Sequence, residues 1–433
     1  MAVSPVNIDL TAETGALPQE TFTDVAVVGT SDTAPPEAEF GEVNRYTSAA
    51  DVSEDYGEGS DVHVAAQALV EEGTSEFYVL VLEETEHVDE SVDSGTTLEN
   101  TPALGEAGVT FDTRETVYTT DDPIDDADVD EGDAHVNTAT GEIVTGDGTT
   151  ATVTYSTVDW TLLERLENEN INRATLADVD SNRAHIGDLD AFVSWATGAD
   201  VGVPIAIDNV GQFADDGEGM NVAHEVAGYV PSGNVIAVAH KSSADVASHL
   251  LGKLATNDPW FNPYFDGDGF AFSSDGIRES LIGDPDTEGT FVGGDDDGNG
   301  PVNVVTTVGG VEVLWKSVST AGAASNYQYF DVKMTEIFAA SVIENALTSL
   351  RLREARVPFT STGRAMIGST IRGALEEYTG GQTDPFAEIE VAVPSHESLT
   401  EDDRANRHWK GIDVEGRLSG DAHEFDLELT VTV

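Results

Sequence analysis

Both ends of the chain alternate between apolar and polar residues. From residue 425 to residue 433 every second side chain is apolar, and the residues between are Asp, Glu or Thr. A shorter run of the same kind spans residues 6 to 10. Because successive side chains of a β-strand point to opposite faces, this period of two predicts a strand at each end. The apolar positions are Val6, Ile8, Leu10, Phe425, Leu427, Leu429, Val431 and Val433.

A strand at an extreme terminus has to join a sheet, because a lone strand leaves its backbone hydrogen-bonding groups without partners. The residues alone leave two alternatives open. Each terminal strand can belong to the sheet of its own subunit, or it can be donated to the sheet edge of a neighbouring copy.

Residues 22–82 have the pattern of an α/β layer. An apolar strand is predicted over 22–30, and apolar residues at helical spacing follow over 62–72. Gly73 ends that helix, and the continuous apolar run 77–82 predicts a second buried strand. Strand, helix and strand in this order favour a mostly buried sheet covered by helices.

The amino-acid composition changes at residue 83 and stays different to about residue 157. This stretch is rich in Asp, Glu, Thr and Gly, and its apolar runs are short. Short strands separated by turn residues indicate a small all-β insertion on the surface. The strand candidates are Val109–Phe111, Thr116–Tyr118, Glu142–Val144 and Ala151–Tyr155.

The α/β pattern returns after the insertion and changes again near residue 320. A helix is predicted at 160–167, strands at 203–207 and 235–239, and a helix at 244–255, followed by a loop-rich stretch over 256–301. The last hundred residues contain two longer helices and then strands. These are predicted at 331–353, 361–378, 389–393 and 412–418.

Together these elements predict a mixed α/β protein of the α+β class. The expected parts are an N-terminal arm at 1–21, an α/β domain made of 22–82 and 158–319, the β-rich insertion at 83–157, an α+β domain at 320–424, and a C-terminal arm strand at 425–433. A chain of 433 residues is long enough to bury the cores of such domains.

The charge balance is extreme. There are 82 Asp and Glu against 19 Lys and Arg, a formal net charge of −63 at pH 7, and the acidic residues are spread along the whole chain. At low ionic strength this self-repulsion opposes both folding and assembly. At about 1 M salt the Debye length is about 3 Å, and the repulsion is nearly screened. The composition therefore indicates a protein adapted to a high-salt interior.

Composition also excludes several classes. The chain contains no cysteine, so disulfides, thiolate metal sites and cysteine nucleophiles are excluded. So few cations cannot easily form the basic face that nucleic-acid binding needs. The N-terminus lacks the pattern of a signal peptide, and no apolar run is long enough to span a bilayer. We expect no nucleic-acid partner, no membrane insertion and folding in the cytoplasm.

Motifs for chemistry are weak. Asp295, Asp297 and Asn299 copy the opening of a calcium loop, but Thr306 stands where the closing carboxylate should be. A solvated acidic turn explains them better than a metal site. His240, Lys241, Ser242 and Asp245 lie close together after a predicted strand, but no nucleophile motif surrounds them. We expect no enzyme activity and no cofactor.

The cations are concentrated near the C-terminus. Ten of the 19 fall between residues 328 and 418. They can pair with nearby acids of the same subunit, or they can form a surface complementary to an acidic partner or a neighbouring subunit. They are Lys333, Arg351, Arg353, Arg356, Arg364, Arg372, Arg404, Arg407, Lys410 and Arg417.

Four stretches resemble contractile tail sheath proteins, the family shared by contractile-tailed phages, phage-tail-like bacteriocins and related injection machines. The stretches are 25–57, 68–82, 239–260 and 329–433. The most specific features are VPFTSTG between two helices and the closing Gly-Ile, Leu-Ser-Gly and His before an alternating strand. The β insertion and residues 256–322 depart from the family pattern.

This resemblance implies a virion structural protein that polymerises helically around a tail tube and contracts. The 320–424 domain would be the inner domain facing the tube, the 22–82 and 158–319 domain would lie outside it, and the arms would insert into neighbours' sheets. The implied partners are other copies, the tail tube, the baseplate and the tail terminator, and the location is the virion tail, assembled in the host cytoplasm at high salt. The tube-facing candidates are Arg351, Arg353, Arg356, Arg364 and Arg372.

Two other classes compete with this interpretation. A tail tube or capsid protein is the nearer alternative, although a tube protein would be shorter and nearly all β. A metal-dependent hydrolase is the other alternative, and it would need a converging cluster of His and acidic residues that the sequence does not provide.

Overall fold

The computed structural model divides the chain into two compact units, which meet in sequence between Phe330 and Asp331. We call the described residues up to 330 the larger unit and those from 331 the C-terminal unit. The described residues are 24–99, 109–111, 116–120, 133–137, 142–145, 148, 150–177, 186–208, 227–228, 230–240, 242–264, 266–273, 301–322, 325–354, 356–381 and 383–419.

The first sheet of the larger unit is built around β3. This strand, Phe77–Val92, runs parallel to β1 and antiparallel to β2 and β9. Its first six residues are apolar and mostly buried, which fits a strand at the centre of a sheet. The strands across the sheet are β10 (Arg173–Leu176), β1 (Val25–Ser31), β3, β9 (Ala151–Val158) and β5 (Val109–Phe111), with β2 (Val43–Tyr46) paired to β3.

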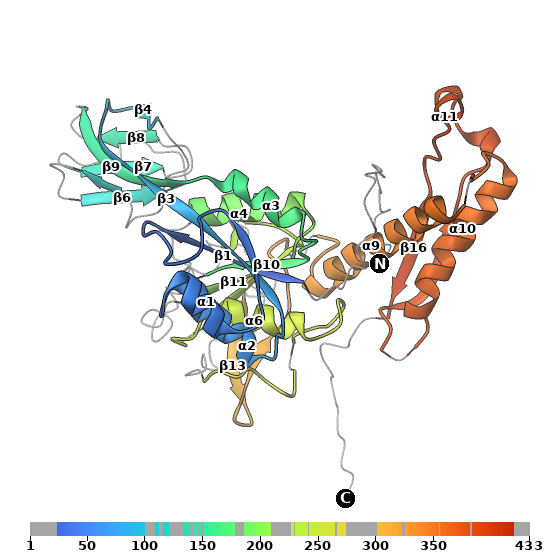
Figure 1. Cartoon of the computed structure of the whole chain (residues 1–433), viewed down its shortest axis with the longest axis horizontal. Coiled ribbons are helices and arrows are strands. Elements are labelled where there is room, and N and C mark those ends of the chain that lie inside the picture. Colours follow the sequence, from blue (N-terminus) through green and yellow to red (C-terminus); the bar gives the residue numbers. More distant parts are fainter. Residues whose placement is uncertain are drawn as a thin grey trace, which may run out of the picture. The chain divides into compact units, whose positions relative to one another are not determined.

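Helices α1 (Ala49–Tyr56) and α2 (Asp61–Glu71) pack on one side of this sheet (Figure 1). The Ser48 side chain accepts a hydrogen bond from the Asp51 N–H and caps the start of α1. The predicted helix over 62–72 is confirmed, and its apolar face is buried together with one face of β1 and β3.

A second sheet in the larger unit has the order β11, β12, β13, β14. The first three strands are parallel, and β14 returns antiparallel to β13 through the Gly309–Gly310 turn. Helices α4 and α6 accompany it, and its buried residues share one core with the other face of the first sheet. The elements are α4 (Ile186–Gly198), β11 (Val203–Asp208), β12 (Val235–His240), α6 (Val246–Ala255), β13 (Asn303–Val308) and β14 (Val311–Trp315).

Arg173 ties β10 to the end of α6. Its side chain is fully buried, and its guanidinium donates hydrogen bonds to the carbonyl oxygens of Leu254, at 2.7 Å, and Pro259, at 3.2 Å. Burial lowers the pKa of Arg173 to about 10. A buried cation thereby satisfies one carbonyl in the last turn of α6 and one in the loop that follows.

The β-rich stretch has its own sheet and its own small core. Strand β3 and strand β9 leave the main sheet as a continuous pair, and beyond them lie β4 (Thr96–Thr97), β8 (Glu142–Thr145), β7 (Asp133–Asn137) and β6 (Thr116–Thr120). The buried residues of this part form a cluster separate from the cores beneath the two larger sheets. They are Val92, Leu98, Val136, Ile143, Ala151, Val153 and Tyr155.

The described part of the C-terminal unit contains two long helices, one short helix and a two-stranded sheet, drawn in orange and red in Figure 1. A Cβ at Gly363 would overlap the Pro358 carbonyl oxygen, so the turn between the helices requires glycine there. The elements are α9 (Phe330–Arg353), α10 (Ser361–Leu375), β15 (Phe386–Ala392), α11 (Glu401–Asn406) and β16 (Asp413–Leu418), with short 3₁₀ turns at Trp160–Leu163 in the larger unit and at Glu376–Tyr378 and His396–Ser398 here.

Several boundaries differ from the prediction. The second long helix ends at Leu375 and continues only as a 3₁₀ turn, not as α-helix to residue 378. The predicted inner domain begins at residue 320, but Val318 bridges Tyr329 and the Thr320 N–H bonds the Val235 carbonyl, so these residues belong to the larger unit. Strand β3 is ten residues longer than the apolar run that predicts it.

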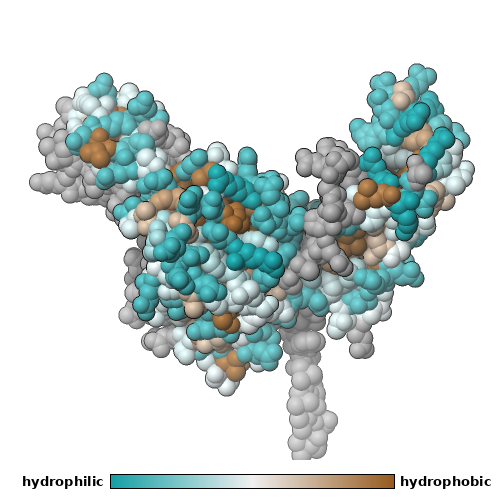
Figure 2. All heavy atoms as spheres, in the orientation of Figure 1, coloured by the Kyte–Doolittle hydropathy of each residue, from teal (hydrophilic) through white to brown (hydrophobic). Residues whose placement is uncertain are grey.

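The surface is strongly hydrophilic. Figure 2 shows mostly hydrophilic residues on the visible face, with small apolar spots between them. The most exposed large apolar side chain among the described residues is Leu352, at 69%. Within these same residues, no helix combines the length and apolar character needed to cross a bilayer.

Candidate inter-subunit surface of the C-terminal unit

Among the residues of the C-terminal unit that the structure describes, the sheet consists of β15 and β16. The two strands pair antiparallel, from Phe386 opposite Leu418 to Ala392 opposite Asp413, with one irregularity between Phe386 and Glu388. One face of the sheet packs against the core of α9 and α10, and the other is exposed. A two-stranded sheet is only marginally stable by itself, so this unit relies on the helices for support.

One hydrogen bond fixes which backbone groups point outward. The Ser419 N–H donates to the Pro385 carbonyl at 2.9 Å, so Phe386 and Leu418 form a pair without hydrogen bonds between them. Such residues direct their own N–H and C=O groups away from the partner strand. On β16 the pattern repeats every second residue from Leu418, so Gly416 and Val414 face outward. Ile389 and Val391 of β15 oppose these two residues after the irregularity and face outward as well.

The five candidate arginines separate into two groups. Arg351 and Arg353 lie at the end of α9, Arg356 follows it, and all three are exposed. The Arg353 Nε lies 3.7 Å from Glu354, in a pair whose arginine side chain is 70% exposed. Such a pair contributes little to stability, which leaves these guanidinium groups accessible to a partner.

Arg364 and Arg372 project from α10 toward β15. The Arg364 Nε donates to the Val393 carbonyl at 2.6 Å, and Nη1 of Arg372 donates to the Val391 carbonyl at 3.1 Å. Both guanidinium groups therefore already bond the backbone of their own subunit. The sequence contains no signal for these contacts, because they depend on how α10 lies along the sheet.

Further cations surround α11. The Thr400 hydroxyl donates to the Asp403 carboxylate and accepts from its N–H, and this capping lowers the pKa of Asp403, with smaller effects of Lys410 and His408. Arg407 ends the helix in the left-handed conformation. On β16, Arg417 lies 3.7 Å from Glu388, and both side chains are more than 70% exposed.

Some candidates lie outside the described residues. These are the weak metal candidates Asp295, Asp297 and Asn299, and the arm residues Val6, Ile8, Leu10, Phe425, Leu427, Leu429, Val431 and Val433. The described parts of the chain bring together no group of three metal-ligating side chains.

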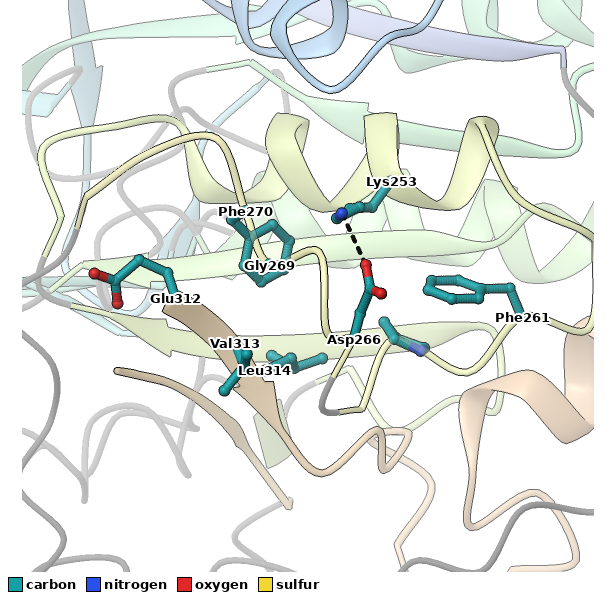
Figure 3. A pocket seen from close by; sticks show the side chains of 9 residues that line it. Lys253, Phe261, Asp266, Gly269, Phe270, Glu312, Val313 and Leu314 are labelled. Atoms are coloured by element: carbon teal, nitrogen blue, oxygen red, sulfur yellow. Dashed lines mark ion pairs between the residues drawn. The ribbon is translucent and has the colours of Figure 1, made fainter. Parts of the chain in front are cut away.

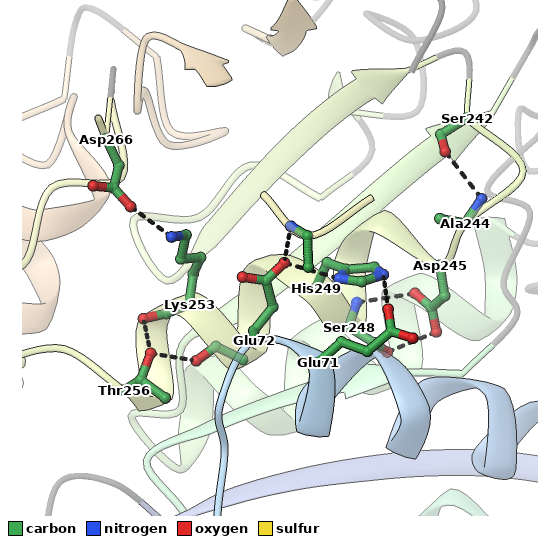
Figure 4. A network of polar contacts seen from close by, with 12 residues as sticks. Glu71, Glu72, Ser242, Ala244, Asp245, Ser248, His249, Lys253, Thr256 and Asp266 are labelled. Atoms are coloured by element: carbon green, nitrogen blue, oxygen red, sulfur yellow. Dashed lines mark hydrogen bonds and ion pairs between the residues drawn. The ribbon is translucent and has the colours of Figure 1, made fainter. Parts of the chain in front are cut away.

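The polar residues after β12 make local structural bonds. The Ser242 N–H donates to Nδ1 of His240 at 3.2 Å, and burial lowers the pKa of His240 to about 4. The Asp245 side chain accepts from the Ser248 N–H at 2.9 Å and caps α6. Figure 4 shows this cap beside the contacts between α2 and α6.

Lys253 and Asp266 form a partly buried ion pair with Nζ and Oδ2 2.8 Å apart. They line a hollow closed by Phe261, Phe270 and Leu314 (Figure 3). The side chains around it leave no room for a water-sized group. This hollow is therefore a packing feature of the larger unit, and the exposed sheet of the C-terminal unit is the better candidate site.

Comparison with protein-family models and with curated protein sequences gives no match. Comparison with solved structures gives matches over nearly the whole chain, and these define the fold as that of contractile sheath proteins. The sheath resemblance noted in the sequence is thus confirmed at the level of the fold.

Three solved structures illustrate the similarity. The helical sheath of the anti-feeding prophage in its contracted state matches with a TM-score of 0.56 and 13% identity, covering 99% of each chain. The sheath complex of the extracellular contractile injection system PVC, also contracted, matches with a TM-score of 0.57 and 11% identity, covering 98% of this chain and 99% of the other. A chain from the anti-feeding prophage baseplate gives 0.56 and 14%, covering 100% of both.

Proposed function

We propose that this chain is the sheath subunit of a contractile tail. It polymerises helically around a tail tube and contracts from a metastable extended state to drive the tube through a target envelope. The observation that carries the proposal is the full-length fold match to contractile sheath proteins at TM-scores of 0.56 and 0.57. A sheath role also explains a chain in which chemistry-bearing motifs are weak.

The two-stranded sheet supports the proposed strand exchange. A sheet of two strands presents outward N–H and C=O groups, and another strand can add to them. The alternating sequences 6–10 and 425–433 supply such strands. A head-to-tail contact that does not close on itself produces a helical polymer, and arms that carry the contacts let the subunit bodies rotate without separating.

The exposed arginines support a contact with the tube. In a chain with net charge −63, Arg351, Arg353 and Arg356 form a small cationic region around the end of α9. A cationic region attracts an acidic partner, and its ion pairs can break when the subunit moves. The proposed partners are other copies of the chain, the tail tube, the baseplate and the tail terminator. The proposed location is the virion tail, assembled in the cytoplasm of a host with high internal salt.

Deletion of residues 425–433 tests the strand exchange. The truncated chain is expected to stay folded but to form no long tubes, because the donated strand is missing. Negative-stain electron microscopy at molar salt, alongside the full chain, measures tube length. Tubes of normal length from the truncated chain would refute the exchange.

Charge reversal tests the tube contact. Arg353→Glu with Arg356→Glu is expected to abolish decoration of tail tubes, while self-assembly of the sheath continues. The matched control is Lys410→Glu, which reverses the charge of an exposed cation of the same unit outside α9 and outside the β15–β16 sheet. Unchanged decoration by the double variant would remove these arginines from the proposed contact.

A further inference from the structure

The two outer edges of the β15–β16 sheet differ in how much of their backbone is already bonded. On the β15 side, the outward carbonyls of Phe386 and Val391, and that of Val393 just after the strand, each accept a hydrogen bond. Phe386 bonds the Gly380 N–H at 2.8 Å, and Thr379 bridges to the same residue. Val391 and Val393 bond the guanidinium groups of Arg372 and Arg364.

The α10 helix brings these groups to the edge because it runs alongside β15 in the opposite direction. Arg364 bonds near the end of the strand, and Arg372, two turns later, bonds Val391. Gly368 lies between them, and a Cβ there would be 3.1 Å from Nη2 of Arg372 and 3.4 Å from Cγ2 of Val393. A helical spacing of four residues places all three on one line.

A strand added to β15 would have to occupy this space. Neighbouring strands lie about 4.8 Å apart, with N–H and C=O groups in contact. The Nη1 atom of Arg372 already lies 3.1 Å from the Val391 oxygen. Strand addition on this side would require both arginine side chains to swing away and two charge-assisted hydrogen bonds to break.

Within the described residues, the other edge has no such cover. The outward groups of β16 belong to Val414, Gly416 and Leu418, and among the described residues none of these accepts or donates a bond on the outer side. The Phe386 ring packs over Gly416 on the sheet, so the strand is held in place while its edge stays open. An open, rigid edge is the usual acceptor for an added strand.

We propose that Arg364 and Arg372 are edge caps, which restrict strand addition to the β16 edge. This inference rests on the proposed sheath function. The strand expected there is the alternating segment Phe425–Val433 of another copy. Its apolar face would extend the core that Val414 and Leu418 already join, and its acidic residues Asp426 and Glu428 would lie near the exposed Arg417. With one acceptor edge for each subunit, each C-terminal arm strand has a single binding position in the lattice.

The absence of cysteine in the native chain allows an unambiguous test. Two full-length double variants are compared, each with an arm cysteine at Thr430 and a second cysteine at either Glu415 or Glu390. These glutamates face each other in register and are both exposed, so they are matched probes of the two edges. Arm cysteines at Glu428 and Thr432 are used in parallel to cover neighbouring registers.

Assemblies are imaged at molar salt, oxidised and separated on a denaturing gel. The inference predicts a series of disulfide-linked multimers with Glu415→Cys. With Glu390→Cys it predicts only the amount of cross-linked product that single-cysteine variants give. Adding Arg364→Met and Arg372→Met is expected to raise cross-linking at Glu390→Cys to the level at Glu415→Cys. The control Lys410→Met removes an exposed cation of the same unit that belongs to neither proposed contact, and it should change neither product.

The outcomes separate the two proposals. Tubes that cross-link equally at both edges, or a Glu390→Cys product that stays at background after both caps are removed, would overturn the edge assignment alone. Complete absence of tubes would refute the sheath function. The edge preference is still scored in that case, because an arm folded onto its own sheet gives an intramolecular disulfide that changes gel mobility.

Discussion

Glu72 and His249 form a buried pair that joins α2 to α6, with Oε1 of Glu72 2.9 Å from Nδ1 of His249. Each side chain is only 4% exposed. The same Oε1 accepts a hydrogen bond from the Ala271 N–H at 2.8 Å, and the Phe272 ring lies beside the imidazole with the two planes tilted at 57°. One carboxylate therefore fastens two helices and a loop of the larger unit (Figure 4).

Replacing Glu72 with Gln should destabilise the larger unit by about 2 kcal/mol, because a charged, buried side chain that accepts two hydrogen bonds becomes neutral. The control is Glu71→Gln on the same helix, whose side chain is 61% exposed and lies 3.9 Å from the imidazole. It should change the free energy of unfolding by less than about 0.5 kcal/mol. Urea unfolding followed by tryptophan fluorescence at constant high salt measures both. Equal midpoints for the two variants would contradict the structural role.

His240 should make the fold sensitive to mild acid. Burial lowers its pKa to about 4 in the folded protein, against about 6.5 in an unfolded chain. Between those values the unfolded chain binds a proton that the folded protein does not. The free energy of unfolding therefore falls as the pH decreases from about 6.5 to about 4, by up to about 3 kcal/mol from this residue.

The variant His240→Asn isolates that contribution, because Asn can still accept the Ser242 N–H bond but does not titrate. We expect the variant to be less stable than the native chain at neutral pH, with the difference shrinking as the pH falls to about 4.5. His408→Asn alters an exposed histidine and should preserve the native pH profile. A constant difference between His240→Asn and the native chain across this range would be inconsistent with a neutral buried His240.

Stability should rise steeply with salt. With 82 acidic residues against 19 Lys and Arg, most carboxylates repel one another until ions screen them. Raising KCl from about 0.05 M to about 3 M should increase the melting temperature by roughly 10 °C or more. Differential scanning calorimetry measures this. Sucrose at equal osmolality is the control, since it excludes itself from protein surfaces without screening charge. A melting temperature independent of KCl would refute the adaptation to high salt.

The β-rich insertion should be removable. Its core residues form a separate cluster, and His87 stands opposite Tyr155 in the β3–β9 ladder, with the two rings stacked at 4.8 Å. Replacing 88–154 by an Asn-Gly turn should join the strands as a hairpin. We expect the free energy of unfolding of the remaining larger unit to stay within about 1 kcal/mol of its value in the native chain. If the deletion variant is insoluble, or unfolded by circular dichroism, the insertion is instead required for folding of the larger unit.

Much of the secondary structure could be predicted from local pattern. Helices α6, α9 and α10 and strands β11, β12 and β16 were identifiable because their apolar residues recur at the period of the element. Helix α4 was missed, although Leu189, Phe192, Val193 and Ala196 are buried at helical spacing. The β13–β14 hairpin was also missed, and there the Gly309–Gly310 pair between apolar runs was a usable signal.

The site was less accessible to sequence reasoning. The clustering of arginines near the C-terminus was visible in the sequence. The sequence offered no basis, however, for distinguishing Arg364 and Arg372 from Arg353. The difference arises from the register of α10 along β15, which no local pattern encodes. The extension of β3 beyond residue 82 was likewise hidden, because its outer half is acidic and exposed and its partners on β9 are 59 to 74 residues away in sequence.

That extension has a mechanical consequence. A load applied to the insertion would travel along the β3 backbone directly into the centre of the main sheet, where β1 and β2 hold the strand in shear over many hydrogen bonds at once. Shear loading is resisted by the whole ladder together. The point of least resistance is the irregularity between His87 and Glu90, where Asp89 has a φ of 56° and the pairing is interrupted. The insertion is thus connected to the rest of the unit through a continuous strand, and this connection bends most easily at the irregularity next to the main sheet.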